Sequence, residues 1–192
     1  MSVTKLYLEK GKEIISVIGE QESKIQEVAQ LFAQSILNGR IVHLFGSGHS
    51  RMMVEEMAAR ILRNFDTSQQ DSALVISSSG CNVVPIEMAE EFQKRNIKVV
   101  ALVSKLHLEG STSKKSDGKK LTDFADYVLD TGAPLGDAMI YLNGLDSPVA
   151  PGSTLGGVLL INCIKAEVAK ILLENGKSPK VLSSGKIVGE KR

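Results

Sequence analysis

Residues 73–82, with the sequence ALVISSSGCN, combine a short apolar run with a turn of small polar residues. The apolar run is typical of a buried strand, and Pro85 after the turn suits the first turn of a helix. The same order occurs upstream, where the apolar run 41–45 precedes the glycine turn 46–50 and a stretch that suits a helix, residues 51–63. The chain therefore repeats a unit of strand, turn and helix.

Further segments continue this alternation. Apolar strands are expected at residues 98–103, 127–129 and 138–142, and a long last helix begins near Ser153 or Thr154, either of which can cap it. Alternating strands and helices predict an α/β fold with a mainly parallel sheet and helices on both faces.

The chain has the length of one domain. Its 192 residues suffice for a single core, and residues 1–39 are expected to form an N-terminal helical segment, since apolar residues recur at spacings of three and four before Gly39. The polar stretch 106–120, which contains several lysines, is expected to be a mobile loop. We therefore predict a single domain over residues 1–192.

The composition excludes several classes of function. The formal charge of +1 and the absence of Trp argue against nucleic-acid binding, and no apolar run approaches the length of a membrane span. Cys81 and Cys163 are far apart and form no zinc-ligand pair. We expect a cytoplasmic protein with no metal and no membrane partner.

Two polar turns are the candidate ligand site, because ligands of open parallel sheets bind beyond the carboxyl ends of the strands. Their glycines permit close approach to a ligand, and their serines offer hydroxyl groups beside the amino terminus of a helix. The candidate binding residues of the first turn are Gly46, Ser47, Gly48 and Ser50, and those of the second are Ser77, Ser78, Ser79 and Gly80.

Other phosphate-binding motifs are absent. A dinucleotide fingerprint would need glycine where the chain has Arg51, and neither a P-loop nor a nucleophile elbow is present. The turns therefore suit one phosphate and a small polar body.

Several segments resemble the SIS, or sugar isomerase, domain family. They are FGSGHS (45–50), SSSGCNVVPIEMA (77–89), ALVS (101–104), SDGKKL (116–121), GDA (136–138) and STLGGVLLINCIKAEV (153–168). The chain looks most similar to stand-alone bacterial members of this family related to phosphoheptose isomerase. The resemblance implies a doubly wound parallel sheet in a flavodoxin-like three-layer sandwich, a sugar-phosphate ligand, no cofactor, and a homodimer or homotetramer.

The resemblance also implies roles for individual residues. The phosphate cradle falls on Ser77, Ser79 and Asn82, although Asn82 stands where Thr or Ser is common. Further contacts with sugar or phosphate would come from Ser47, Ser50 and Ser104.

An aldose–ketose isomerase would need a base and an acid near the ligand. Glu55, Glu56 and His49 are the candidate catalytic residues, with Glu87 and His107 as further possibilities. His43 is expected to be a hydrogen-bonded core residue. The last helix lacks the histidine that the family's isomerases tend to use, which argues against a conventional isomerase.

Three functions stay open: an isomerase-like enzyme, a noncatalytic sugar-phosphate sensor, and another phosphate-binding protein such as a flavodoxin-like carrier. Few aromatic residues are present to hold a flavin. Four lysines, at positions 114, 115, 119 and 120, are candidates to close over a phosphate, although such a charge run is more often solvated.

One departure from the family pattern concerns the middle of the chain. Family members usually have a further strand and helix between the two turns, whereas only residues 64–72 separate them here. Either the protein is shortened or the sequence omits a segment, and the first strand would then lie at an open edge of the sheet.

Overall fold

The computed structural model describes residues 1–46, 50, 52–54 and 68–179. Its central feature is a four-stranded sheet in which all neighbouring strands run parallel. The strands follow one another across the sheet in chain order: β1 (Val42–Gly46), β2 (Ser72–Ile76), β3 (Lys98–Val103) and β4 (Tyr127–Asp130). All four carboxyl ends therefore meet at one edge of the sheet.

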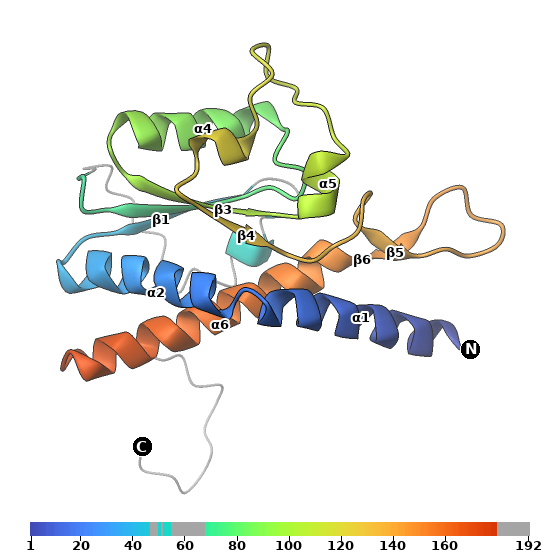
Figure 1. Cartoon of the computed structure of the whole chain (residues 1–192), viewed down its shortest axis with the longest axis horizontal. Helices are drawn as coiled ribbons and strands as arrows, with labels where there is room; N and C mark the ends of the chain where they lie inside the picture. Colours follow the sequence, from blue (N-terminus) through green and yellow to red (C-terminus); the bar gives the residue numbers. More distant parts are fainter. Residues whose placement is uncertain (47–49, 51, 55–67, 180–192) are drawn as a thin grey trace, which may run out of the picture.

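Helices cover both faces of the sheet (Figure 1). One face carries α2 (Glu22–Leu37) and α6 (Gly152–Glu174), with α1 (Val3–Gly19) packed against α6. The other face carries α4 (Val83–Lys94) and the 3₁₀ helix η2 (Leu121–Phe124), and α5 (Lys105–Glu109) follows the carboxyl end of β3. This arrangement confirms the predicted α/β fold.

The two cores follow from the alternation of side chains along each strand. On β2, Leu74 and Ile76 belong to the core against α1, α2 and α6, whereas Ala73 and Val75 belong to the core against α4. All five residues of β2 are buried, as expected of a strand covered on both faces. β1 is only partly buried along its whole length, and it forms one edge of the described sheet.

The strand expected at residues 138–142 does not join the parallel sheet. β5 (Ala138–Ile140) pairs antiparallel with β6 (Val149–Pro151), and the two form a separate ribbon that Figure 1 shows beyond the end of α5. The eight residues between the two strands, 141–148, allow such a hairpin, whereas a parallel neighbour would need a longer crossover. The strand was therefore predicted in the right place, and the structure shows that its partner is β6 rather than the parallel sheet.

The last helix is capped from outside. Gly152 is its first residue, so Ser153 and Thr154 lie inside its first turn and neither is the N-cap. Asp137 accepts hydrogen bonds from the amide of Ser153 at 2.7 Å and from its hydroxyl at 2.8 Å. A carboxylate at the positive end of a helix stabilises it, and this one belongs to the residue before β5 rather than to the expected serine or threonine.

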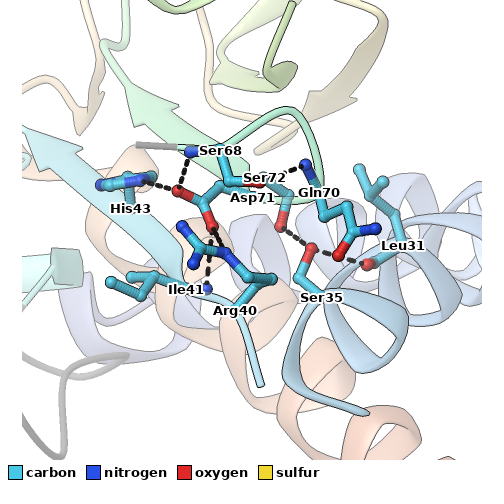
Figure 2. A network of polar contacts seen from close by, with 9 residues as sticks. All are labelled: Leu31, Ser35, Arg40, Ile41, His43, Ser68, Gln70, Asp71 and Ser72. Atoms are coloured by element: carbon cyan, nitrogen blue, oxygen red, sulfur yellow. Dashed lines mark hydrogen bonds and ion pairs between the residues drawn. The ribbon is translucent and has the colours of Figure 1, made fainter. Parts of the chain in front are cut away.

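A buried polar network joins β1 and β2 at their amino ends (Figure 2). The Asp71 side chain is fully buried and accepts from Arg40 and the Ile41 amide through Oδ1 at 3.0 and 3.2 Å. Its Oδ2 pairs with His43 Nε2 and the Ser68 amide, both at 3.0 Å. His43 is thus the hydrogen-bonded residue that the sequence predicts.

The Asp71 network fixes the charge of its carboxylate. Burial raises the pKa of this carboxyl group, but the hydrogen bonds with His43, Ser68, Arg40 and Ile41 outweigh that effect and lower the pKa to about 2. Asp71 therefore stays ionised at neutral pH, and each of its two carboxylate oxygens has two hydrogen-bond partners.

None of the helices in the described part of the chain is long and apolar enough to cross a lipid bilayer.

Candidate functional site

The carboxyl edge of the sheet brings together the ends of all four strands. The residues that follow β2, Ser77 to Asn82, form the serine turn that leads into α4. The Ser77 amide donates to Leu102 of β3 at 3.0 Å, and the Ser104 amide, after β3, donates to the Ser78 carbonyl at 2.9 Å. The serine turn therefore sits firmly at the sheet edge where ligands of this fold class bind.

Gly80 explains the shape of this turn. Its φ of +61° is a left-handed conformation that favours glycine, and an added Cβ would lie 2.6 Å from Leu108 Cδ1 of α5. The carbonyl of Gly80 accepts from the Leu121 amide at 2.8 Å. The turn is thus fixed by α5 on one side and by η2 on the other.

Polar groups of the serine turn lack partners in the described part of the chain. The Ser77 hydroxyl is buried and has no hydrogen bond, and the amides of Ser78, Ser79 and Asn82 donate to no described residue. The Ser79 hydroxyl accepts from the Cys81 amide at 3.3 Å, which leaves its own proton free to be donated. Ser77 is buried, whereas Ser78, Ser79 and Asn82 are partly buried and open to a ligand. Buried polar groups are normally paired, and donors beside a helix amino terminus are suited to an anion.

Asn82 lies at the N-cap position of α4. Its side chain makes no capping bond to the helix, and no acidic residue occupies the first turn. The positive end of the helix dipole at the serine turn is therefore not offset by a carboxylate of α4.

Ser104 contributes to the structure of this edge. Its buried hydroxyl donates to the Ala133 carbonyl at 2.7 Å and accepts from the His107 amide at 3.2 Å, where it caps α5. Through these bonds Ser104 links the ends of β3 and β4, close beside the serine turn.

The glycine turn is described only in part. Gly46 ends β1, and an added Cβ there would lie 2.7 Å from the Ser50 carbonyl, so close packing requires glycine. Ser50 itself is buried. The other candidates of this region, Ser47, Gly48, His49, Glu55 and Glu56, lie outside the described residues.

The polar stretch 106–120 is more regular than the sequence predicts. Its first part belongs to α5, and the rest is held to the serine turn, since the Lys114 amide donates to the Cys81 carbonyl at 2.9 Å. Cys81 Sγ also lies 3.7 Å from the Ser111 carbonyl. Burial raises the pKa of the Cys81 thiol, and Lys120 and Lys114 oppose this rise.

Two of the three histidines can be placed relative to this edge. His43 contacts Asp71 at the amino ends of the strands, so it lies at the opposite edge from the serine turn. His107 of α5 lies at the carboxyl edge, and its buried Nδ1 has no partner among the described residues. Glu87 is an exposed residue of α4.

A separate cavity of about 250 Å³ lies between α1 and the β5 ribbon. The residues that line it include Ile14, Leu106, Pro134 and Met139, and no residue of the serine turn is among them.

In the described residues, no three His, Cys, Asp or Glu side chains gather in a way that could hold a metal ion.

The SIS domain family model matches residues 6–67 and 58–104, which together span half of the chain. The chain belongs to the SIS domain family. A UPF0309 protein of Thermoanaerobacter pseudethanolicus is 31% identical over 218 residues, which cover 93% of this chain and 88% of that protein. The predicted resemblance to stand-alone bacterial SIS proteins is thereby confirmed.

Solved structures show the same fold at low sequence identity. A phosphoheptose isomerase from Francisella tularensis has a TM-score of 0.57 and 16% identity, with coverage of 88% of this chain and 100% of that one. The Vibrio vulnificus NanR protein complexed with ManNAc-6P also has a TM-score of 0.57 and 16% identity, with coverage of 88% and 63%.

The alignment with the UPF0309 protein bears on the expected missing segment. It spans 218 positions, whereas 93% of this 192-residue chain is about 179 residues, so that relative has about 40 residues without a counterpart here. The family model matches in two pieces that overlap at residues 58–67. Both observations agree with the shortened connection between the two turns.

Proposed function

We infer that this protein binds a sugar phosphate, with the phosphate at the serine turn. The observation that carries this inference is the group of free donors there: the Ser77 and Ser79 hydroxyl protons and the amides of Ser78, Ser79 and Asn82, all beside the amino terminus of α4. Donors of this kind can hydrogen-bond to the oxygens of a phosphate, and the amino terminus of the helix favours its negative charge.

Two family structures support this choice of ligand. The Vibrio vulnificus NanR protein is complexed with ManNAc-6P, and the Francisella tularensis structure is a phosphoheptose isomerase. The sugar would extend from the phosphate toward the glycine turn, where we keep Gly46, Ser47, Gly48 and Ser50 as candidate contacts. Ser104 would position the edge through its bonds to Ala133 and His107.

Calorimetry with the whole chain tests this function. The ligands are N-acetylmannosamine 6-phosphate, fructose 6-phosphate, glucosamine 6-phosphate, N-acetylmuramic acid 6-phosphate and sedoheptulose 7-phosphate, beside their unphosphorylated sugars, FMN and NAD. We expect at least one sugar phosphate to bind and its free sugar not to. Binding of FMN or NAD alone, or of no compound, would overturn the inference.

Ser79→Ala tests the location of the phosphate. It removes a hydroxyl donor, so affinity for the bound sugar phosphate should fall about tenfold, the effect of one hydrogen bond to a charged group. Ser23→Ala is the matched control, because this exposed serine lies in α2, on the face of the sheet opposite α4. Equal affinity in Ser79→Ala and the native chain would show that the phosphate does not bind at the serine turn.

Isomerisation is the second candidate function, and one observation favours it. His107 of α5 lies at the carboxyl edge of the sheet, and its buried Nδ1 has no partner among the described residues, so it could exchange a hydrogen bond with a ligand that reaches it. Glu55, Glu56 and His49 stay candidates for the base and the acid. If His107→Asn, Glu55→Gln and Glu56→Gln all still turn over the bound sugar phosphate, the chemistry belongs to other residues. If the native chain binds a sugar phosphate without converting it, the protein is a noncatalytic sensor.

A further inference from the structure

Four lysines occur between residues 114 and 120, and the structure distinguishes one of them by its surroundings. Lys115 pairs with Asp117, and its Nζ also lies 3.3 Å from Glu90 Oε2. Lys119 lies over the Phe124 ring with Nζ 5.1 Å from its centre, and Lys120 donates to the Leu108 carbonyl at 2.6 Å. These three ammonium groups therefore already have partners outside the serine turn: Glu90 and Asp117, the Phe124 ring, and the Leu108 carbonyl. Lys120 is near enough to Cys81 to oppose the rise of its pKa, as Lys114 does, but it donates to no residue of the turn.

Lys114 is held differently. Its Nζ donates to Asn82 Oδ1 at 3.0 Å, and it forms no ion pair with any described carboxylate. Asn82 is the N-cap residue of α4, so the ammonium group lies at the positive end of that helix. Two positive groups thus meet at the serine turn with only a neutral amide oxygen between them.

The position of Lys114 is fixed through its backbone. Its amide donates to the Cys81 carbonyl at 2.9 Å, and the loop is held again where the Leu121 amide donates to the Gly80 carbonyl at 2.8 Å. Both acceptors belong to the serine turn. Because these anchors hold the backbone of Lys114 beside the turn, its exposed side chain has to be ordered only within reach of Asn82 Oδ1, to which it already donates.

We propose that Lys114 is a phosphate-binding residue of the serine turn and makes the site select a phosphorylated sugar over the free sugar. The inference rests on the proposed function and deepens it. In the free protein the Asn82 amide oxygen occupies the place of the anion. When phosphate binds, the ammonium group transfers its hydrogen bond from Asn82 Oδ1 to a phosphate oxygen.

The same contacts explain Asn82, which departs from the hydroxyl residue common in the family. A Thr or Ser at this position would donate one hydrogen bond to the phosphate. Asn82 instead holds the lysine in place before binding and leaves its Nδ2 protons for the ligand. The charge of Lys114 would compensate for the lost hydroxyl donor.

Calorimetry of Lys114→Met, Lys114→Arg and Lys119→Met with the sugar phosphate that the native chain binds best, and with inorganic phosphate, tests this proposal. Lys119→Met is the matched control, because it removes the same charge from the same loop. We expect Lys114→Met to weaken both ligands about tenfold or more, Lys114→Arg to retain affinity within about threefold, and Lys119→Met to match the native chain.

The outcomes separate this proposal from the proposed function. If Ser79→Ala weakens binding but Lys114→Met does not, Lys114 is not a ligand and the phosphate site stands. Equal losses in Lys114→Met and Lys119→Met would show a general effect of charge and also overturn the proposal. If the native chain binds none of the phosphates, the proposed function fails, and this proposal fails with it. Thermal unfolding of each variant confirms that any loss of affinity occurs in a folded protein.

Discussion

The two edges of the parallel sheet differ in whether their polar groups have hydrogen-bond partners. At the amino edge, one buried carboxylate, Asp71, has four donors around its two oxygens. At the carboxyl edge, the buried Ser77 hydroxyl has no partner in the described chain, and several amides of the serine turn donate to nothing there. A satisfied network stabilises the fold, whereas unsatisfied donors cost stability until a ligand pairs them. We therefore expect the amino edge to contribute to stability and the carboxyl edge to bind the ligand.

Asp71→Asn should produce the largest effect on stability. It leaves Arg40 and His43 beside a neutral amide, and removal of one partner from a buried ion pair costs about 3–5 kcal/mol. Denaturant unfolding measures the loss. Asp126→Asn is the matched control, since this partly exposed carboxylate pairs with Lys98 and the Val99 amide at the same edge and should cost about 1 kcal/mol or less. A similar small loss for Asp71→Asn would contradict the role of the network.

Acid should weaken the protein through the same carboxylate. The pKa of Asp71 falls from 3.8 to about 2 on folding, so its contribution is fully present above pH 3.8 and is lost as the pH falls through about 2. The shift corresponds to roughly 2 kcal/mol. Comparison of unfolding free energies at pH 5 and pH 2 in the native chain and in Asp71→Asn isolates it, because the variant should lose less stability in this range. The same loss in both proteins would show that other groups cause the acid sensitivity.

Ser77→Ala should affect the carboxyl edge in the opposite sense. The hydroxyl is buried and has no partner in the part of the chain that the structure describes. Its removal should therefore leave the unfolding free energy within about 0.5 kcal/mol or raise it, while affinity for a sugar phosphate falls about tenfold. Ser35→Ala is a useful comparison, because its buried hydroxyl is paired with Ser72 at 3.0 Å and with the Leu31 carbonyl at 3.3 Å. A larger loss of stability in Ser77→Ala than in Ser35→Ala would contradict the contrast between the edges.

The sequence predicts the parallel sheet well because its strands are short apolar runs, and the two central ones, β2 and β3, are buried on both faces. It also predicts α2, in which Ile25, Val28, Ala29 and Phe32 recur at helical spacing and are all buried. The sequence does not predict the antiparallel pairing of β5 with β6, since a three-residue strand carries no signal of whether its partner is parallel or antiparallel. The sequence also does not predict that Asp137 caps α6, because Asp137 is distant in sequence from the helix that it stabilises.

The candidate site was predictable in its location but not in its details. Turns of glycine and serine after apolar strands indicate an edge where anions bind, and they led to Ser77, Ser79 and Asn82. The sequence presented four lysines as one charge run. Only their contacts separate Lys114 from the other three, because partners such as Phe124 and Cys81 are brought to the loop by tertiary packing.

The most direct test of the central claim follows backbone amides by ¹⁵N NMR while the sugar phosphate found by calorimetry is added to the whole chain. If phosphate binds at the serine turn, the amides of Ser78, Ser79 and Asn82 should shift strongly, and those of Ile41 and Ser68, already bonded to Asp71, should stay in place. Shifts at the amino edge or around the cavity near Met139, with the serine-turn amides unmoved, would contradict it.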